Sequence, residues 1–121
     1  ALEELRGYDH IIIDAPPNLG TLTVNALTAS ARVLVPTIPD YLSLRGLLLF
    51  LDTLGLVRRR LNPALQVLGV LPTMYDARLL HGRDVIEAME RHGIRVLPMR
   101  IARTVRERLE EAGVEIAPIT A

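Results

Sequence analysis

The sequence has 121 residues, half of them hydrophobic, and its 14 basic and 14 acidic residues give a formal net charge of zero. This length favours a single domain with one core, and the neutral balance means that binding to nucleic acid or to an anionic membrane would require a local basic patch. Cysteine is absent and all the basic residues are arginine, which excludes disulfides, thiol chemistry, lysine catalysis and a phosphate-loop lysine within these residues.

Near the start, an apolar run ends in a carboxylate and two prolines: Tyr-Asp-His-Ile-Ile-Ile-Asp-Ala-Pro-Pro-Asn-Leu-Gly, residues 8–20. Three consecutive isoleucines predict a strand at residues 10–14, covered on both faces as in a parallel sheet. Pro16 and Pro17 end this strand close to Asp14. Ligands bind outside the carboxyl ends of parallel strands, so Asp14 is a candidate for chemistry. The alternative is an aspartate that only caps the proline turn.

The other segments alternate between strand and helix patterns along the chain. We expect helices at residues 1–7 (the end of one), 20–30, 44–61, 83–92 and 103–112, and strands at 32–36, 66–71, 94–97 and 114–119, the last being either a strand or an extended tail. Ser43 is the expected N-cap of the long helix, and Gly93 is expected to close the helix that precedes it. The order predicts an α/β fold with a mostly parallel β-sheet flanked by helices.

In their order and spacing, these segments resemble the ParA/Soj chromosome- and plasmid-partitioning ATPases, in the deviant Walker A branch of P-loop proteins that also contains MinD. Residues 8–17 look like the Walker B or switch II segment, and residues 19–29 are similar to the helix that follows it. Residues 35–46 resemble the family's Pro-x-x-x-Glu-Tyr-x-x-Leu-x-Gly segment, with Asp40 in place of glutamate. Residues 71–78 and 101–106 follow in family order, with Ala102 in place of a proline.

The resemblance implies a P-loop NTPase-like fold, ATP and Mg²⁺ as cofactors, and roles for particular residues. Asp14 would be the catalytic Walker B carboxylate, holding Mg²⁺ through water. Asn18 and Gly20 would belong to the switch that senses the γ-phosphate, or else only cap a helix. Thr73, Met74, Pro98 and Arg100 would lie on the adenine side, where core packing is the alternative for the methionine. Asp40 and Tyr41 could line the nucleotide or dimer face, or only end a loop.

Arginine is concentrated in one stretch. Between residues 91 and 108 there are six arginines and one acid, a local charge of +5 on a neutral chain. Such arginines can neutralise phosphates without reading bases. The resemblance places contacts with non-specific DNA at Arg78 and Arg106, with Arg103 close by. The alternative is a solvated helix face paired with glutamates.

The family's Lys-Gly-Gly-x-Gly-Lys-Thr loop does not occur in these residues. We therefore interpret residues 1–121 as a single α/β domain, the C-terminal portion of a ParA-like ATPase domain or a naturally truncated relative, and expect no ATP hydrolysis from the chain alone. The resemblance implies a cytoplasmic, nucleoid-associated protein that forms a homodimer with ATP and is activated by a ParB-like partner. It implies no binding to a membrane. The alternatives are a non-enzymatic receiver-like signalling domain, disfavoured by the lack of lysine, or a truncated dimerisation or DNA-binding module.

Overall fold

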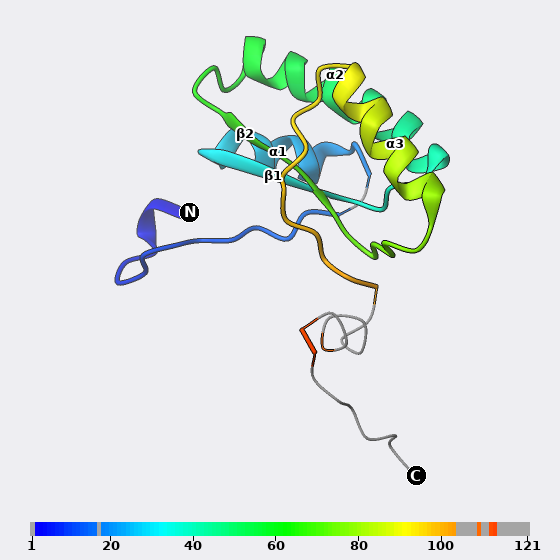
Figure 1. The fold of residues 1–121 in the computed structure, drawn as a ribbon. Helices are drawn as coiled ribbons and strands as arrows, with labels where there is room; N and C mark the ends of the chain where they lie inside the picture. The colour runs from blue at the N-terminus through cyan, green and yellow to red at the C-terminus, as the bar shows by residue number, and fades with distance from the viewer. Residues whose placement is uncertain (1, 17, 104–108, 110–111, 114–121) are drawn as a thin grey trace. The chain divides into compact units, whose positions relative to one another are not determined.

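The computed structural model describes residues 2–16, 18–103, 109, 112 and 113. Its elements, in chain order, are a 3-10 turn η1 (Leu2–Glu4), α1 (Thr21–Ala29), β1 (Arg32–Thr37), α2 (Tyr41–Arg60), β2 (Gln66–Pro72) and α3 (Leu80–Arg91) (Figure 1). The chain divides into two compact units, which we describe separately. The first unit comprises residues 1–33 and 48–67, and the second unit comprises residues 34–47 and 68–121.

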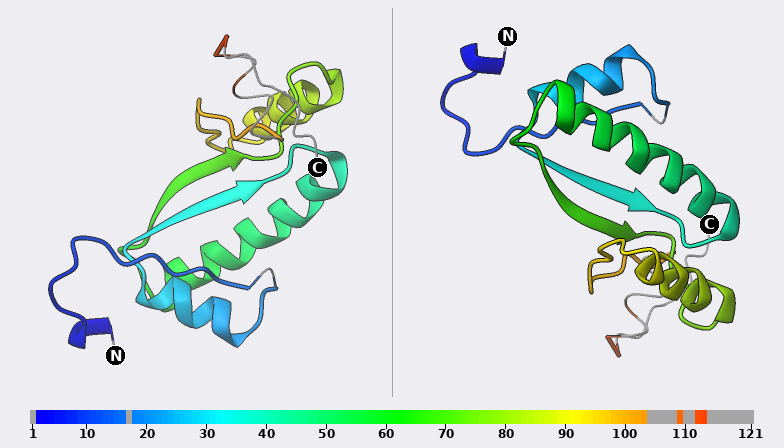
Figure 2. Two further views of the ribbon diagram at one scale, coloured as in Figure 1. Left: turned by 90° about the horizontal axis from the view of Figure 1, so that it is seen from below. Right: turned by 90° about the horizontal axis from the view of Figure 1, so that it is seen from above.

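Strands β1 and β2 form a parallel pair. Beside one end, the N–H of Gln66 donates to the carbonyl of Ala31 at 3.0 Å, and beside the other, the N–H of Thr73 donates to the carbonyl of Thr37 at 2.9 Å. Residue numbers rise together along both strands, so the strands run in the same direction, as the arrows in Figure 2 show. The strands predicted at residues 32–36 and 66–71 are confirmed.

The first unit is organised around a small apolar core. Its four fully buried members come from α1, from α2 and from the residue that precedes β2: Leu27, Leu54, Val57 and Leu65. The amide of Asn62 fastens the end of α1 to this core, because its Nδ2 donates to the carbonyls of Leu27 at 3.0 Å and of Ser30 at 2.7 Å. Helix α1 thus forms where the sequence predicts it, and its last carbonyls have partners.

Helix α3 of the second unit buries the apolar face that its spacing predicts. The buried side chains on that face are between 0% and 6% exposed: Val85, Ile86 and Met89. Gly93 closes the helix as expected, with a φ of +75°, which favours glycine. Its N–H donates to the carbonyl of Glu90 at 3.0 Å, and that of Ile94 donates to Met89 at 3.1 Å, which is the Schellman pattern.

The strand predicted at residues 10–14 is not present, and this expectation was wrong. Among the described residues, none makes a backbone hydrogen bond with residues 9–14. The three isoleucines, which we expected to be buried on both faces, are 46%, 92% and 41% exposed. An apolar segment becomes a sheet strand only when a neighbouring strand pairs with its backbone, and the described part of the chain supplies no such neighbour.

Other expected elements are shorter than predicted or lie beyond the described residues. The helix end expected at residues 1–7 is one 3-10 turn, although Gly7 does have a φ of +82°. The strand expected at 94–97 is reduced to a single parallel bridge between Val96 and Val70. Most of the helix expected at 103–112, and all of the segment 114–119, lie outside the described residues. Within the described residues, no helix is both long and apolar enough to span a membrane.

Candidate functional site

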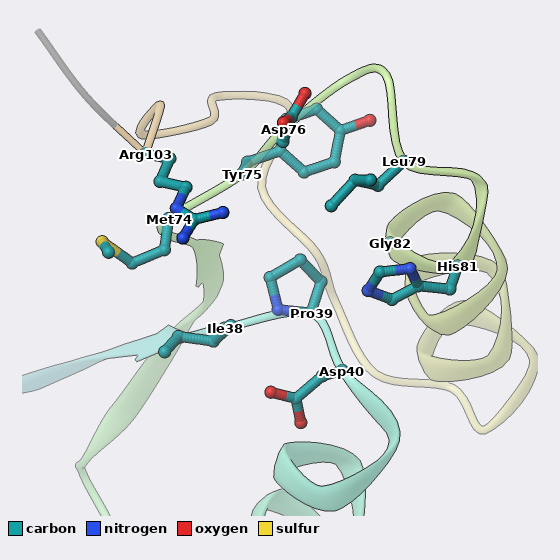
Figure 3. A pocket seen from close by; sticks show the side chains of 10 residues that line it. All are labelled: Ile38, Pro39, Asp40, Met74, Tyr75, Asp76, Leu79, His81, Gly82 and Arg103. Carbon is teal, nitrogen blue, oxygen red and sulfur yellow. The ribbon is translucent and has the colours of Figure 1, made fainter.

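A pocket of about 280 Å³ lies in the second unit, next to the ends of β1 and β2 (Figure 3). It is bordered by the residues that follow each strand, by the beginning of α3 and by Arg103. The lining residues are Ile38, Pro39, Asp40, Met74, Tyr75, Asp76, Leu79, His81, Gly82 and Arg103. The pocket therefore occupies the position where parallel sheets commonly bind ligands, outside the carboxyl ends of the strands.

One wall of the pocket is apolar and closely fitted. Pro39 is buried, and Gly82 lies in the first turn of α3 opposite both Pro39 and the ring of Tyr75. A methyl group added at Gly82 would meet Tyr75 Cε2 at 3.7 Å and Pro39 Cγ at 3.9 Å, which is ordinary contact distance. A side chain larger than alanine at Gly82 would therefore enter the space between the helix and the strand ends.

Met74 has an unusual backbone conformation beside the pocket. Its φ is +52°, which makes it the one non-glycine residue with a positive φ in the described part of the chain. This conformation is unfavourable for a side chain without local polar groups and is often found at functional sites. The neighbouring backbone holds it in place, because Thr73 and Tyr75 both donate hydrogen bonds to other segments. Met74 is half exposed and borders the pocket.

Asp40 has a structural task at the start of α2. Its Oδ1 accepts a hydrogen bond from the N–H of Ser43 at 2.6 Å, and its carbonyl accepts one from Leu44 at 3.1 Å. Asp40 is therefore the N-cap of a helix that begins at Tyr41. The expectation that Ser43 caps this helix was wrong, because the helix begins at Tyr41 and its first turn already includes Ser43.

The turn after β2 contains a two-point ion pair. Nε and NH2 of Arg78 donate to the two carboxylate oxygens of Asp76, each at 2.9 Å, and the backbone N–H of Arg78 donates to Oδ1 at 3.0 Å. The side-chain and then the backbone hydrogen bonds from Arg78 lower the pKa of Asp76 to about 2, with a smaller effect from the charge of Arg103. The carboxylate is therefore ionised at neutral pH.

The loop after residue 97 is fixed to the turn after β2. Ile101 donates to the carbonyl of Pro72 at 2.9 Å, Tyr75 to Ile101 at 3.0 Å and Arg103 to Tyr75 at 3.2 Å, with a parallel bridge between Tyr75 and Ala102. The guanidinium of Arg100 lies 5.7 Å from the centre of the Tyr75 ring, within cation–π range, and donates to the carbonyls of Leu97 and Met99. The two loops therefore form one paired structure.

The residues predicted for the adenine side are partly brought together by this pairing. Thr73 and Met74 follow β2, while Pro98 and Arg100 belong to the loop paired with that turn. Only Met74 of these four borders the pocket. Their contact with a nucleotide stays a prediction.

The predicted metal-side residues belong to the first unit. Asp14 is exposed, and its carboxylate has no hydrogen-bond or ion-pair partner among the described residues. Asn18 Oδ1 accepts from the N–H of Gly20 at 3.1 Å, just before α1 begins. The hydroxyl of buried Thr23 donates to the carbonyl of Asn18 at 2.6 Å and lies 3.2 Å from that of Pro16. The loop that leads into α1 is thus held by α1 itself.

The three arginines predicted to contact DNA have different surroundings. Arg78 is 77% exposed while paired with Asp76, and Arg103 is exposed beside the pocket. Arg106 lies outside the described residues. Their contact with DNA stays a prediction.

Sequence reasoning missed several residues that border the pocket. Tyr75 and Asp76 lie within residues 71–78, which resemble the family but carry no predicted role, and no pattern in the sequence singles out His81. Within the described residues, no three histidine, aspartate or glutamate side chains gather as a metal site would require. The turn motif itself, an aspartate two residues before an arginine at a strand end, could have indicated the ion pair.

Comparison with known proteins identifies the class. A family model described as "AAA domain" matches residues 1–67, more than half of the sequence, and the chain belongs to this family. More specifically, it is of the ParA/Soj partitioning type. It is 50% identical over 93 residues to the sporulation initiation inhibitor protein Soj of Bacillus subtilis, and 46% identical over 101 residues to the chromosome-partitioning ATPase Soj of Thermus thermophilus. These alignments cover 76% and 83% of the chain.

A solved structure supports the fold. A crystal structure of cobyrinic acid a,c-diamide synthase from Mycobacterium smegmatis with bound ATP analogue and magnesium matches 86% of the chain with a TM-score of 0.79 and 46% identity. The predicted α/β fold of the P-loop NTPase type, in partial form, is therefore confirmed. The chain spans 37% and 41% of the two Soj relatives and 42% of the solved chain, about two fifths of each.

Proposed function

We propose that the protein containing this chain is an ATP-dependent switch for chromosome or plasmid partitioning. With ATP and Mg²⁺ it forms a homodimer that binds DNA non-specifically, and hydrolysis stimulated by a ParB-like partner releases the DNA. The observation that carries this proposal is the 46–50% identity to the Soj proteins over most of the chain. A cytoplasmic location on the nucleoid is part of the same proposal.

Asp14 is the proposed Mg²⁺-side carboxylate. Its side chain, which is exposed and has no partner among the described residues, suits a hard cation that keeps most of its water shell and takes few direct protein ligands. The ion would neutralise charge on the phosphates. Within the chain, Asn18 and Gly20 form the adjoining loop, and the bond from Thr23 to Asn18 ties this loop to α1. A change at the loop would therefore reach the helix directly.

On the base side, the proposal assigns Thr73, Met74, Pro98 and Arg100. Support comes from the paired loops, because the bonds between residues 72–75 and 101–103 tie the turn that carries Thr73 and Met74 to the loop that carries Pro98 and Arg100. An apolar surface with backbone polar groups is suited to a purine ring. The DNA-facing residues are Arg78, Arg103 and Arg106.

The first test concerns ATP chemistry in the intact protein. We expect Asp14→Ala to abolish ATP hydrolysis. We also expect the 121-residue chain alone to show no hydrolysis, since it contains no lysine and no Lys-Gly-Gly-x-Gly-Lys-Thr loop. If the isolated chain hydrolyses ATP and Asp14→Ala abolishes that activity, the prediction that hydrolysis needs the rest of the protein is contradicted.

The second test concerns DNA. In the intact protein, the double change Arg78→Glu/Arg106→Glu should weaken binding to duplex DNA while nucleotide binding is retained. The matched control is Arg58→Glu/Arg59→Glu, which makes the same charge change at two exposed arginines at the end of α2, outside the arginine-rich stretch 91–108. If both double variants lose DNA affinity equally, the loss reflects net charge alone and the specific role of Arg78 and Arg106 is contradicted.

A second candidate follows from the solved neighbour, whose described activity is the synthesis of a diamide. The two candidates separate by what stimulates ATP hydrolysis. A partitioning switch responds to DNA and its protein partner, whereas a cobyrinic acid a,c-diamide synthase responds to cobyrinic acid. The family assignment also favours either ATPase over the receiver-like alternative.

A further inference from the structure

The ion pair after β2 is unequal in exposure. The Asp76 side chain is 10% exposed, whereas the Arg78 side chain is 77% exposed. The guanidinium therefore faces solvent while the carboxylate behind it is sheltered, and both carboxylate oxygens are committed to Arg78. Any anion that approaches the guanidinium must compete with a carboxylate that is already bound in the favoured two-point geometry.

A second arginine, Arg103, borders the same pocket as Asp76 (Figure 3). The backbone of Arg103 is bonded to Tyr75, the residue before Asp76. The two arginines and the aspartate together carry a net charge of +1, where the arginines alone would carry +2. A single aspartate thus halves the positive charge of this surface.

Asp76 also helps to form the turn. Its Oδ1 accepts from the backbone N–H of Arg78, and its carbonyl accepts from the N–H of Leu79 at 3.1 Å. Asparagine makes the same turn, because its side-chain oxygen accepts an equivalent backbone hydrogen bond. The substitution Asp76→Asn therefore separates the charge of Asp76 from its role in the turn.

We infer that Asp76 sets the strength with which this surface binds the phosphate backbone of duplex DNA, by holding Arg78 in an ion pair that a phosphate must displace. The inference depends on the proposed DNA binding through Arg78. A surface ion pair contributes at most about a fivefold factor to an equilibrium constant, so its loss should change the affinity for DNA by no more than that. Each phosphate contact adds about 0.9 to the slope of log K against log salt. Asp76 therefore moderates affinity and does not abolish it.

The experiment measures binding of the intact protein with ATP to duplex DNA of arbitrary sequence, between about 50 and 200 mM salt. Asp76→Asn should bind up to about fivefold more tightly at low salt, with a salt slope steeper by about one. The matched control Asp52→Asn removes the same charge from an exposed position on α2 and should leave both quantities unchanged. Adding Arg78→Gln to Asp76→Asn should cancel the gain.

Several outcomes would overturn the inference, and they separate it from the proposed function. If Arg78→Gln weakens DNA binding but Asp76→Asn does not strengthen it, the role of Asp76 is wrong and the DNA role of Arg78 stands. Equal gains from Asp76→Asn and Asp52→Asn would reduce the effect to net charge, which also rejects the inference. If Arg78→Gln leaves DNA binding unchanged, both the proposed contact and the inference fail.

Discussion

Two segments with predicted site residues have opposite surroundings. Residues 9–14 carry Asp14 and make no backbone hydrogen bonds with the described residues, and their isoleucines are exposed. Residues 73–76 carry Met74 and Asp76 and are bonded on both sides, through Thr73 to Thr37 and through Tyr75 to Ile101. The first segment is the more apolar of the two in sequence, so the difference comes from backbone partners. Apolar composition makes burial favourable, but pairing decides whether it occurs.

The largest expected difference between the regions is in stability. Ile86→Ala, on α3 of the second unit, should lower the free energy of unfolding of the chain by about 2–5 kcal/mol, because this side chain is 6% exposed. The same change at Ile12, which is 92% exposed, should alter it by less than about 0.5 kcal/mol. Urea denaturation of both variants gives the comparison. Similar losses would show that residues 9–14 are packed in solution.

A second change tests the close approach of β2 to residues 95–97 in the second unit. Gly69 has a φ of +138°, and an added Cβ would lie 2.9 Å from the carbonyl oxygen of Arg95. Gly69→Ala should therefore cost about 1–3 kcal/mol of unfolding free energy. The control Gly46→Ala lies in α2 with open space around the new methyl group and should stabilise the chain by about 0.5–1 kcal/mol. Thermal unfolding distinguishes the two, and a neutral Gly69→Ala would contradict the close approach.

A third test compares two aspartates. Asp40 caps α2, so Asp40→Ala should cost about 1 kcal/mol, and Asp40→Asn should recover most of the loss because the cap acceptor is retained. Asp14 has no partner among the described residues, so Asp14→Ala should leave the unfolding free energy unchanged. Chemical denaturation measures both. An equal loss at Asp14 would mean that its carboxylate supports the fold.

The smallest expected effect is the response of Asp76 to pH. Its pKa is lowered from 3.8 to about 2 by Arg78, so the ionised pair contributes to stability above the ordinary value and this contribution is lost as the pH falls through about 2. Carboxyl chemical shifts measured by NMR during an acid titration locate the midpoint. Arg78→Gln should move it back toward 3.8. A wild-type midpoint already near 3.8 would show that the pair does not persist in solution.

Local pattern predicted helices α1, α2 and α3 and strands β1 and β2 well, because a helix forms its backbone hydrogen bonds within itself and these two strands pair with each other. The burial of Val85, Ile86 and Met89 follows directly from their helical spacing. The strand at residues 10–14 could not be predicted reliably, since its partner is not encoded in its own residues. The helix start at Asp40 was misplaced because aspartate and serine are both good N-caps, and only the fold decides which one is used.

In the candidate site, too, some features could be predicted from the sequence and others depend on the fold. The resemblance pointed to the segments that contain Met74 and Arg100, and the structure places these residues on paired loops. The border formed by Tyr75, His81 and Gly82 depends on how the turn after β2 meets α3. Such contacts join residues whose side chains meet only after the turn has formed, so no periodicity in the sequence reveals them.

The bridge between Tyr75 and Ala102 has a consequence for the position of Arg103. Successive residues of a paired segment point to opposite sides, so a shift of one residue in the pairing of residues 101–103 with the turn after β2 would exchange the sides that these residues occupy. Arg103 would then leave the pocket, and its backbone would lose the carbonyl of Tyr75. The register of residues 101–103 against this turn therefore keeps Arg103 beside the pocket, whatever residues occupy the loop before it.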